Sequence, residues 1–137
     1  MNVVIDTNVL VSGLLTPFGN PSEILRLVAL GKVSICYDAR IIAEYHEVLK
    51  RPTFKFNQET VSLLIKEFQL TGEFTVGVPL NESLPDKDDN MFLEVALGSN
   101  AECIITGNLH HFPKGLCFDI KIYSPSDFLN FYKQGRI

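Results

Sequence analysis

A chain of 137 residues, 46% hydrophobic and 20% charged, has the composition of an ordinary globular protein rather than a disordered one, and its length fits one domain with a sizeable core. The formal net charge of −4 argues against a protein that binds nucleic acid through bulk positive charge, but it allows an enzyme with an acidic site and a local basic strip. No apolar run approaches the ~20 residues of a membrane-spanning helix, so we expect no membrane association.

The start of the chain and its cysteines predict a cytoplasmic protein. The first residues have a strand pattern rather than a charged leader followed by an apolar segment, so we expect no secretory signal. The cysteines Cys36, Cys103 and Cys117 are odd in number and lack CxxC spacing. Cys36 and Cys103 lie in apolar strand-like runs, where a reduced thiol in the core is expected.

Short β-branched runs alternate with helical patterns, without an internal repeat, low-complexity tract or linker. The predicted strands are residues 3–5, 33–37, 74–78, 102–106 and 120–124, and the predicted helices are 22–31, 39–50, 57–70 and 89–98. The first of these helices is expected to start at a Ser22 cap and to end at Gly31. The alternation predicts one α/β domain over residues 1–137, with a mainly parallel central sheet flanked by helices. In such folds the ligand crevice lies outside the carboxyl ends of the strands, where Asp6 and the 106–108 turn are expected.

The segment VVIDTNVLVSG, residues 3–13, places a carboxylate directly after a strand that is β-branched throughout. Such a strand is covered on both faces, so an ionised Asp6 needs a compensating charge. A helix N-terminus, a basic residue or a metal ion would each supply that charge. The polar residues Thr7 and Asn8 follow at once, and the segment alone leaves the three alternatives open.

Helical geometry separates the candidate acids from other acidic residues. On the 39–50 helix, Glu44 lies at the border of the apolar stripe and can reach inward, whereas Glu47 lies well away from it and is expected to be a solvated surface charge. A rim glutamate with no special task is the alternative for Glu44. On the 89–98 helix, Asp89 falls inside the apolar arc, so its carboxylate should face the interior. The alternative is helix capping, with Asp86 at the N-cap and Asp89 near the positive end of the helix dipole.

Two adjacent histidines follow the strand predicted over 102–106. The strand ends in the turn of Thr106, Gly107 and Asn108, and His110 and His111 come next. Because neighbouring side chains diverge, we do not expect both histidines to bind one metal ion. One of them can contact a substrate, and an exposed turn without function is the alternative.

The segment KRPTFKF, residues 50–56, combines basic and aromatic side chains. Its basic residues Lys50, Arg51 and Lys55 lie beside two phenylalanines, a composition that suits single-stranded RNA. We therefore expect these three residues to contact substrate. The alternative is an ordinary helix end, with basic residues near the negative end of the helix dipole and a proline stop.

Together these segments resemble the PIN domain family, and within it the stand-alone prokaryotic proteins related to VapC, which are toxin components of toxin–antitoxin pairs. The resemblance covers essentially the whole chain. VVIDTNVLVSG is similar to the first motif with Asp6 as its acid, IIAEYHEVLKRP to the second with Glu44, and DKDDNMFLEVAL to the third with Asp89 seven residues before Ala96. IITGNLHHFP is similar to the fourth motif, but it has Asn108 where PIN nucleases commonly carry an aspartate. Four motifs in this order are a specific joint signal.

The resemblance implies a three-layer α/β/α PIN-like fold that gathers Asp6, Glu44 and Asp89 at the carboxyl edge of the sheet. Clustered carboxylates resist ionisation unless a cation compensates them, and oxygen ligands suit Mg²⁺ or Mn²⁺. The implied activity is that of a metal-dependent endoribonuclease, which hydrolyses RNA phosphodiester bonds with these three acids as catalytic metal ligands. Polar neighbours would orient waters or carboxylates, or ligate the ion weakly: Thr7, Asn8, Asn108 and Asp86. Because Asn108 is neutral, one metal ion and two metal ions remain alternatives.

The implied partners are an RNA substrate and a cognate antitoxin protein, and homodimers are common among such proteins. Two other interpretations compete. A PIN fold without a metal would be a non-catalytic RNA- or protein-binding module, which Asn108 favours and the three retained acids oppose. A phosphatase with Asp6 as its nucleophile would carry a second aspartate two positions later, where this chain has Asn8.

Overall fold

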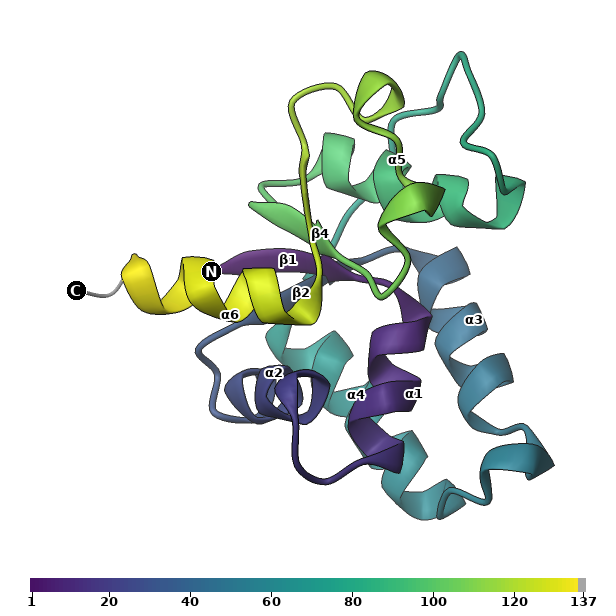
Figure 1. Ribbon diagram of the computed structural model, residues 1–137. Helices are drawn as coiled ribbons and strands as arrows, with labels where there is room; N and C mark the ends of the chain where they lie inside the picture. Colours follow the sequence, from purple (N-terminus) through teal and green to yellow (C-terminus); the bar gives the residue numbers. More distant parts are fainter. Residues whose placement is uncertain (136–137) are drawn as a thin grey trace.

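The computed structural model describes residues 1–135 and has the alternating order of strands and helices that the sequence predicts (Figure 1). Within this part of the chain, five strands form one sheet in the order β3-β2-β1-β4-β5, and all neighbouring strands are parallel. The strands are β1 (Asn2–Ile5), β2 (Ser34–Tyr37), β3 (Glu73–Phe74), β4 (Cys103–Ile105) and β5 (Lys121–Tyr123). The central strand β1 is fully buried from Val3 to Ile5, as its uninterrupted β-branched residues predict.

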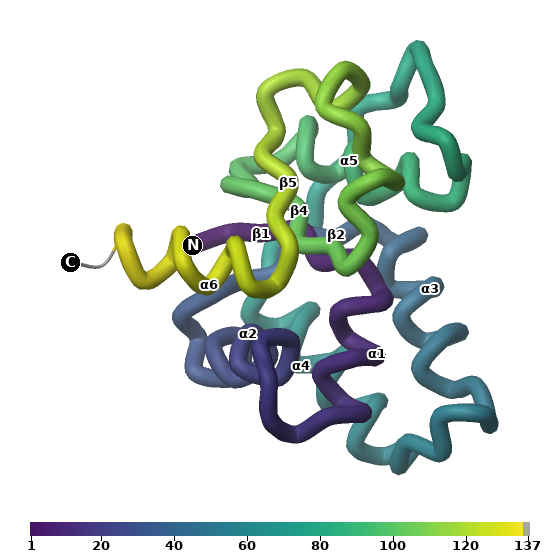
Figure 2. The backbone as a smooth tube through the Cα atoms, in the orientation of Figure 1, coloured from purple at the N-terminus to yellow at the C-terminus, as the bar shows by residue number. Residues whose placement is uncertain are grey.

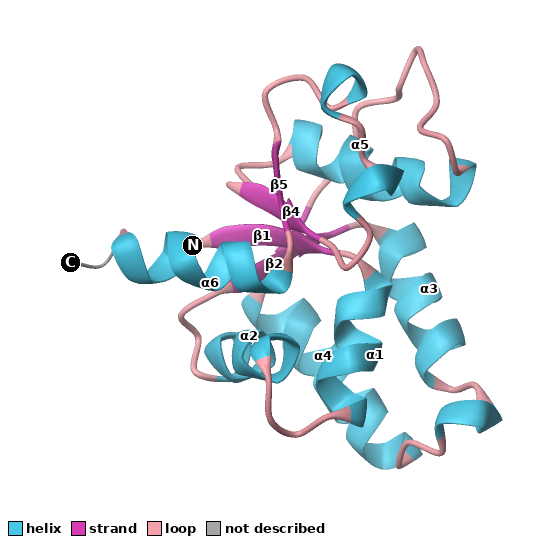
Figure 3. Cartoon of the chain, in the orientation of Figure 1, coloured by secondary structure: helices cyan, strands magenta, loops and turns pink. Residues whose placement is uncertain are grey.

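Helices cover both faces of the sheet and give three layers (Figures 1 and 3). On one face α5 (Asn90–Gly98) packs against β1, β2 and β4, and on the other lie α2 (Asn20–Ala29), α4 (Gln58–Thr71) and α6 (Pro125–Gln134). The remaining helices α1 (Thr7–Leu15) and α3 (Ala39–Leu49) follow β1 and β2 directly and extend from the carboxyl edge of the sheet. The predicted three-layer α/β/α class is confirmed.

Most element boundaries agree with the predicted ones to within one residue. The helices α3 and α4 begin where their capping side chains lie: Asp38 accepts a hydrogen bond from the Ile41 N–H and Asn57 from the Thr60 N–H, each at 3.0 Å. Short 3₁₀ turns occupy the connections: η1 (Pro52–Phe54), η2 (Lys87–Asp89), η3 (Leu109–His111) and η4 (Lys114–Leu116).

Two helices, α1 and α6, were not predicted. The sequence of α1, TNVLVSGLL, is apolar on most sides, so no 3.6-residue pattern marks it. Gly13 brings α1 close to α2, since a Cβ at this position would lie 2.6 Å from Leu25 Cδ1. The start of α6 does carry local signals: Ser124 accepts a hydrogen bond from the Asp127 N–H at 3.1 Å, and Pro125 opens the first turn.

The predicted start of α2 at a Ser22 cap is wrong. The helix begins at Asn20, with Pro21 in its first turn, and the preceding Gly19 has a φ of 137°, which favours glycine. Ser22 is buried inside the helix, and its hydroxyl donates to the carbonyl oxygens of Pro17 at 3.0 Å and Gly19 at 3.1 Å. Its role is to close the preceding loop.

The strand predicted over 74–78 is also wrong in its extent. β3 comprises only Glu73–Phe74, and Thr75 makes one more backbone hydrogen bond to β2 at 2.8 Å. The chain then turns to α5, where the Val78 N–H donates to the Glu94 carbonyl oxygen at 2.9 Å. Figure 2 shows that the long connection from β3 to η2 passes α5 without regular structure. Beyond Thr75 the segment thus pairs with a helix at Val78 and no longer with β2.

The cysteines agree with the expectation of reduced thiols. Cys36, Cys103 and Cys117 are all buried and unpaired. Burial raises the pKa of Cys103 to about 12, so its thiol stays neutral. No helix in the described chain is both long and apolar enough to cross a membrane.

Candidate active site

Asp6 lies at the carboxyl edge of the sheet, where β1 and β4 end beside each other (Figure 1). Its backbone N–H donates to the Ile105 carbonyl oxygen at 2.9 Å, which fixes the position from which the side chain extends. Thr106 follows β4 and is fully buried, and its hydroxyl donates to Asp6 Oδ2 at 2.8 Å. The Asn8 amide donates to the same oxygen at 3.3 Å. Two protein donors therefore replace part of the water that the buried Asp6 lacks.

Glu44 reaches this edge from α3. Its half-buried carboxylate accepts a hydrogen bond from the hydroxyl of Thr7, the residue next to Asp6. The contact joins α3 to the first turn of α1. Glu47 is exposed and pairs with Arg51 at 2.9 Å. As predicted, Glu44 is turned toward the interior and Glu47 toward solvent.

Asp89 ends the turn η2 and is buried, as its predicted place in the apolar arc requires. Its Oδ2 lies 3.1 Å from His111 Nδ1 but off the line of an aligned hydrogen bond, and this buried oxygen accepts no hydrogen bond within the described chain. Asp86 caps the η2 turn: its carboxylate accepts a hydrogen bond from the Asp88 N–H at 2.9 Å. Capping therefore accounts for Asp86 but not for Asp89.

One hollow of about 420 Å³ brings most of the predicted residues together. Its lining includes Thr7, Asn8, Glu44, Arg51, Asp86 and Asp89. A neighbouring hollow of about 440 Å³ shares Glu44 and Asp88 with the first. Residues from α1, α3 and the η2 turn thus meet in one place, with the buried Asp6 at the foot of α1.

All three acids have a raised pKa, and the charge of Asp6 contributes to the rise at Glu44 and at Asp89. Burial raises the pKa of Asp6, against the lowering effect of the Thr106 hydrogen bond. The pKa of Glu44 is raised by burial and by the charge of Asp6, although the Thr7 hydrogen bond opposes this. Burial, with the charges of Asp6 and Asp86, raises the pKa of Asp89 to about 6, and nearby His111 partly offsets the rise. The acids therefore interact electrostatically and lack full charge compensation.

The donor set of this site fits a hard divalent cation, although its side chains do not yet enclose one. Across residues 1–135, no three aspartate, glutamate, histidine or cysteine side chains converge closely enough to hold a metal ion. The like-charged carboxylates are instead held by hydroxyl groups of Thr7 and Thr106. Their ligand atoms are oxygens, which a hard cation prefers, and their pKa values are raised, an effect that a bound cation would oppose. Joint binding by Asp6, Glu44 and Asp89 requires side-chain rotation.

Other predicted residues lie outside this group. Within the described chain, the Asn108 side chain makes no hydrogen bond to the three acids; its backbone N–H donates to Thr106 Oγ1 at 3.0 Å. Lys50 and Lys55 are exposed and do not line the hollow. Arg51 does line it, while paired with Glu47, and Phe54 beside it stacks on the Phe56 ring at 5.5 Å between ring centroids.

Two contacts of this region were not predicted. One is the hydrogen bond from Thr106 to Asp6, and the other is a link between α3 and α5, in which Arg40 binds Asp38 at 2.7 Å and Glu94 at 2.6 Å. Thr106 could have been found from the sequence, because it follows one predicted strand as Asp6 follows another, and neighbouring parallel strands end at the same edge of a sheet. No local pattern distinguishes His111 from His110, because the distinction depends on the direction of each ring.

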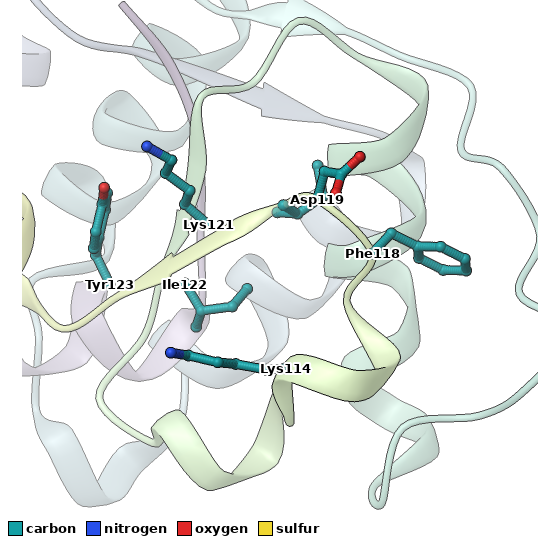
Figure 4. Close-up of a pocket in the computed structure, with 7 residues that line it drawn as sticks. Lys114, Phe118, Asp119, Lys121, Ile122 and Tyr123 are labelled. Atoms are coloured by element: carbon teal, nitrogen blue, oxygen red, sulfur yellow. The ribbon is translucent and has the colours of Figure 1, made fainter.

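A separate hollow of about 320 Å³ beside β5 has a different chemistry (Figure 4). It is lined by Lys114, Phe118, Asp119 and residues of β5, and in Figure 4 the ammonium groups of Lys114 and Lys121 lie apart. Lys121 lies over the Phe131 ring, 5.9 Å from its centroid. The lysines do not converge on one point, so we assign no site there.

The fold and the site define a class of protein: a parallel α/β domain with interacting carboxylates at the carboxyl edge of its sheet. The family model described as PIN domain matches residues 2–110, and the chain therefore belongs to the PIN domain family. The chain is 34% identical over 113 residues to an uncharacterized protein of Methanocaldococcus jannaschii, a match that covers 79% of this chain and 71% of that protein. No solved structure gives a significant match. PIN domains are commonly nucleases, so the family supports, at the level of general class, a hydrolase that acts on nucleic acid.

Proposed function

We propose that this protein is a ribonuclease that depends on a divalent metal ion and hydrolyses RNA phosphodiester bonds. The observation that carries the proposal is the meeting of Glu44 and Asp89 in one hollow of a PIN domain, with Asp6 interacting electrostatically with both. Acids with raised pKa values in a hollow are typical of sites that perform chemistry. Their oxygen ligands suit Mg²⁺ or Mn²⁺.

In this mechanism Asp6, Glu44 and Asp89 would hold the ion. When bound, it supplies Lewis-acid chemistry, which makes water more acidic and neutralises phosphate charge. Thr106 and Asn8 hold the Asp6 carboxylate, and Thr7 holds that of Glu44, so hydroxyl and amide donors orient the acids. The hydrolysis forms a bond from a water oxygen to phosphorus and breaks the bond from phosphorus to the leaving 3′ oxygen.

Substrate contact is proposed for the rim formed by Arg51 and Phe54. Both line the acidic hollow, so a phosphate at Arg51 and a base stacked near Phe54 would lie beside the acids. Lys50 and Lys55 are exposed close by and can extend this contact along a single strand. RNA is favoured over DNA because of the resemblance to VapC-like proteins.

The same resemblance supports a toxin component that acts in the cytoplasm, is held in check by a cognate antitoxin protein, and can form homodimers. Expression of the chain alone should then arrest growth of a bacterial host, and the Asp6→Asn variant should not. Growth at the normal rate with the active wild-type enzyme would argue against the toxin role while leaving the nuclease proposal intact.

The nuclease proposal is tested by incubating purified protein with mixed RNAs in Mg²⁺, Mn²⁺ or EDTA. We expect cleavage only with metal and a loss of more than about 100-fold in Asp6→Asn and Asp89→Ala, because removal of a ligand should exceed the 10- to 100-fold typical of residues that only support ligands. The exposed acid Asp119 provides the control, and Asp119→Ala should cleave as the wild type does. Cleavage by Asp6→Asn at the wild-type rate would refute the assignment.

A non-catalytic binding module is the second candidate. It is favoured by the neutral Asn108 and by the absence, within residues 1–135, of three side chains already converged on one metal position. Such a module would bind RNA equally well in EDTA and in Mn²⁺ and would leave it intact. The wild-type arm of the same assay separates this candidate from the nuclease.

A further inference from the structure

The two adjacent histidines have different surroundings because of the turn that carries them. In η3 the His111 N–H donates to the Asn108 carbonyl oxygen and the Phe112 N–H to the Leu109 carbonyl oxygen, each at 3.0 Å. Phe112 is buried and anchors the end of the turn. His110 is exposed, whereas His111 is half-buried, and their ring planes are inclined by 68°. The turn therefore directs one ring toward the site and the other toward solvent.

His111 lies beside Asp89 and is near enough to Asp6 to affect its pKa. Its Nδ1 is 3.1 Å from Asp89 Oδ2, and its presence lowers the pKa of both Asp89 and Asp6. Asp89 Oδ2 is buried and accepts no aligned hydrogen bond from the described residues, so a small rotation of the imidazole would give this oxygen a donor. A carboxylate has two oxygens, and one can accept from an imidazole while the other serves as a ligand.

Besides His111, the fourth motif contributes Thr106, whose hydroxyl holds Asp6, whereas the Asn108 side chain makes no such contact among residues 1–135. The Asn108 amide bonds to none of the acids within the described chain, and it lines a separate hollow of about 240 Å³ with Asn8 and Gly107. The contact that points to a role for His111 is the short distance from its Nδ1 to Asp89 Oδ2 in this chain.

We propose that His111 is a positioning residue, which orients the Asp89 carboxylate for cation binding by donating a hydrogen bond from Nδ1 to Oδ2. This inference rests on the proposed metal-dependent function. In this chain His111, rather than Asn108, is the side chain of the fourth motif that acts on Asp89.

The test compares four variants: His111→Ala, His111→Asn, His111→Gln and His110→Ala. An asparagine amide can take the place of Nδ1, whereas a glutamine amide takes that of Nε2, so only the asparagine variant keeps the donor near Asp89. Mn²⁺ affinity is measured by isothermal titration calorimetry at pH 7.5, and kcat and KM are measured on RNA. Folding of each variant is checked by thermal melting in EDTA.

We expect His111→Ala and His111→Gln to bind Mn²⁺ roughly 10- to 100-fold more weakly and to lose kcat in proportion, with KM for RNA unchanged. His111→Asn should recover most of the affinity, and His110→Ala should match the wild type. Equal Mn²⁺ affinity in the asparagine and glutamine variants would overturn the positioning role, even if His111→Ala fails to fold. A wild-type protein that binds no Mn²⁺ and cleaves no RNA would refute the proposed function itself, and the positioning role with it.

Discussion

Asp6 shows how a carboxylate is kept at a buried strand end. Thr106, a hundred residues further along the chain, donates a hydrogen bond to it, and Asn8 donates a second. These neutral donors lower the cost of burial but do not cancel the charge, so the pKa of Asp6 remains raised. At the level of single residues, the site is held in place by hydroxyls and left short of positive charge.

The Thr106 hydroxyl is predicted to contribute measurably to stability. Thr106→Val keeps the shape of the side chain, but the Asn108 N–H loses its partner and Asp6 Oδ2 keeps only the longer hydrogen bond from Asn8. We expect a loss of about 1–3 kcal/mol in the free energy of unfolding, measured by urea denaturation at pH 7. The exposed Thr53→Val is the control, and a loss at Thr106 no larger than at Thr53 would show that these hydrogen bonds do not stabilise the site.

Asp89 gives a prediction for the pH dependence of stability. Its pKa is about 6 in the folded protein and near 3.8 when unfolded, so the native state binds the proton more tightly and stability falls as pH rises from about 4 to 6. Above pH 6 the full cost of ionising Asp89 is present. In EDTA, Asp89→Asn should therefore raise the free energy of unfolding at pH 7.5 by on the order of 2–3 kcal/mol, and by much less at pH 4.

Urea denaturation of both proteins at the two pH values measures this difference. Asp119→Asn, at an exposed position, serves as the matched control and should change little. A gain at Asp89 that is the same at pH 4 and pH 7.5 would mean that the substitution acts through packing rather than through charge.

At the scale of elements, the site depends on how closely helices approach the strands. Gly72 is the capping residue at the end of α4 and connects this helix to β3. At Gly72 the chain lies close to Ile35 of β2. A Cβ on Gly72 would lie 2.2 Å from the Ile35 carbonyl oxygen and 2.5 Å from that of Phe68. The absence of a side chain is thus what allows β3 to pair with β2.

Gly72→Ala is predicted to destabilise the fold for this reason. Since both close atoms belong to backbone, the strain cannot be relieved by a side-chain rotation, and we expect a loss of at least about 2 kcal/mol in the free energy of unfolding. Gly115→Ala is the control, because a Cβ there meets nothing within 4 Å. Similar urea midpoints for the two variants would contradict the close approach.

The element scale also explains the predicted strand that proved too long. Residues 74–78 have the β-branched and aromatic composition of a strand, but β3 ends at Phe74. Beyond Thr75, Glu94 of α5 provides hydrogen-bond acceptors for this segment. Its carbonyl oxygen accepts from the Val78 N–H, and its carboxylate accepts from the Leu80 N–H at 3.2 Å. Composition predicts what a segment can form, and the available hydrogen-bond partners decide where it stops.

At the scale of the whole molecule, metal binding and folding are linked. A cation that binds the acids only when they are brought together by the fold must stabilise that fold. We expect Mn²⁺ at 100 times its Kd to add about 2.7 kcal/mol to the free energy of unfolding, visible as a rise in Tm that EDTA reverses.

The Asp6→Asn and Glu44→Gln variants should lose most of this rise, while Asp119→Asn should keep it. Below pH 6 the rise should also shrink for the wild type, because protons compete with the ion for Asp89. An unchanged Tm at millimolar Mn²⁺ would favour the non-catalytic binding module.

Much of the fold was predictable from local patterns. The sequence marks the β-branched runs that form β1, β2, β4 and β5, and it marks the amphipathic patterns of α3 and α4. It does not mark the apolar helix α1, because a helix buried on most sides has no polar face to reveal its period. The resemblance to the PIN domain family grouped Asp6, Glu44 and Asp89, and helical spacing agreed with an inward direction for Glu44 and Asp89.

The sequence by itself determined the parallel α/β order, because strand and helix periodicity are present in consecutive residues. Its resemblance to a family named the candidate acids Asp6, Glu44 and Asp89. Only the tertiary structure decided that Thr7 holds Glu44, that Thr106 holds Asp6, and that His111 rather than Asn108 lies against Asp89. These contacts join residues from different elements. They depend on the direction in which each side chain leaves the backbone, which is fixed only when the sheet and its helices are packed.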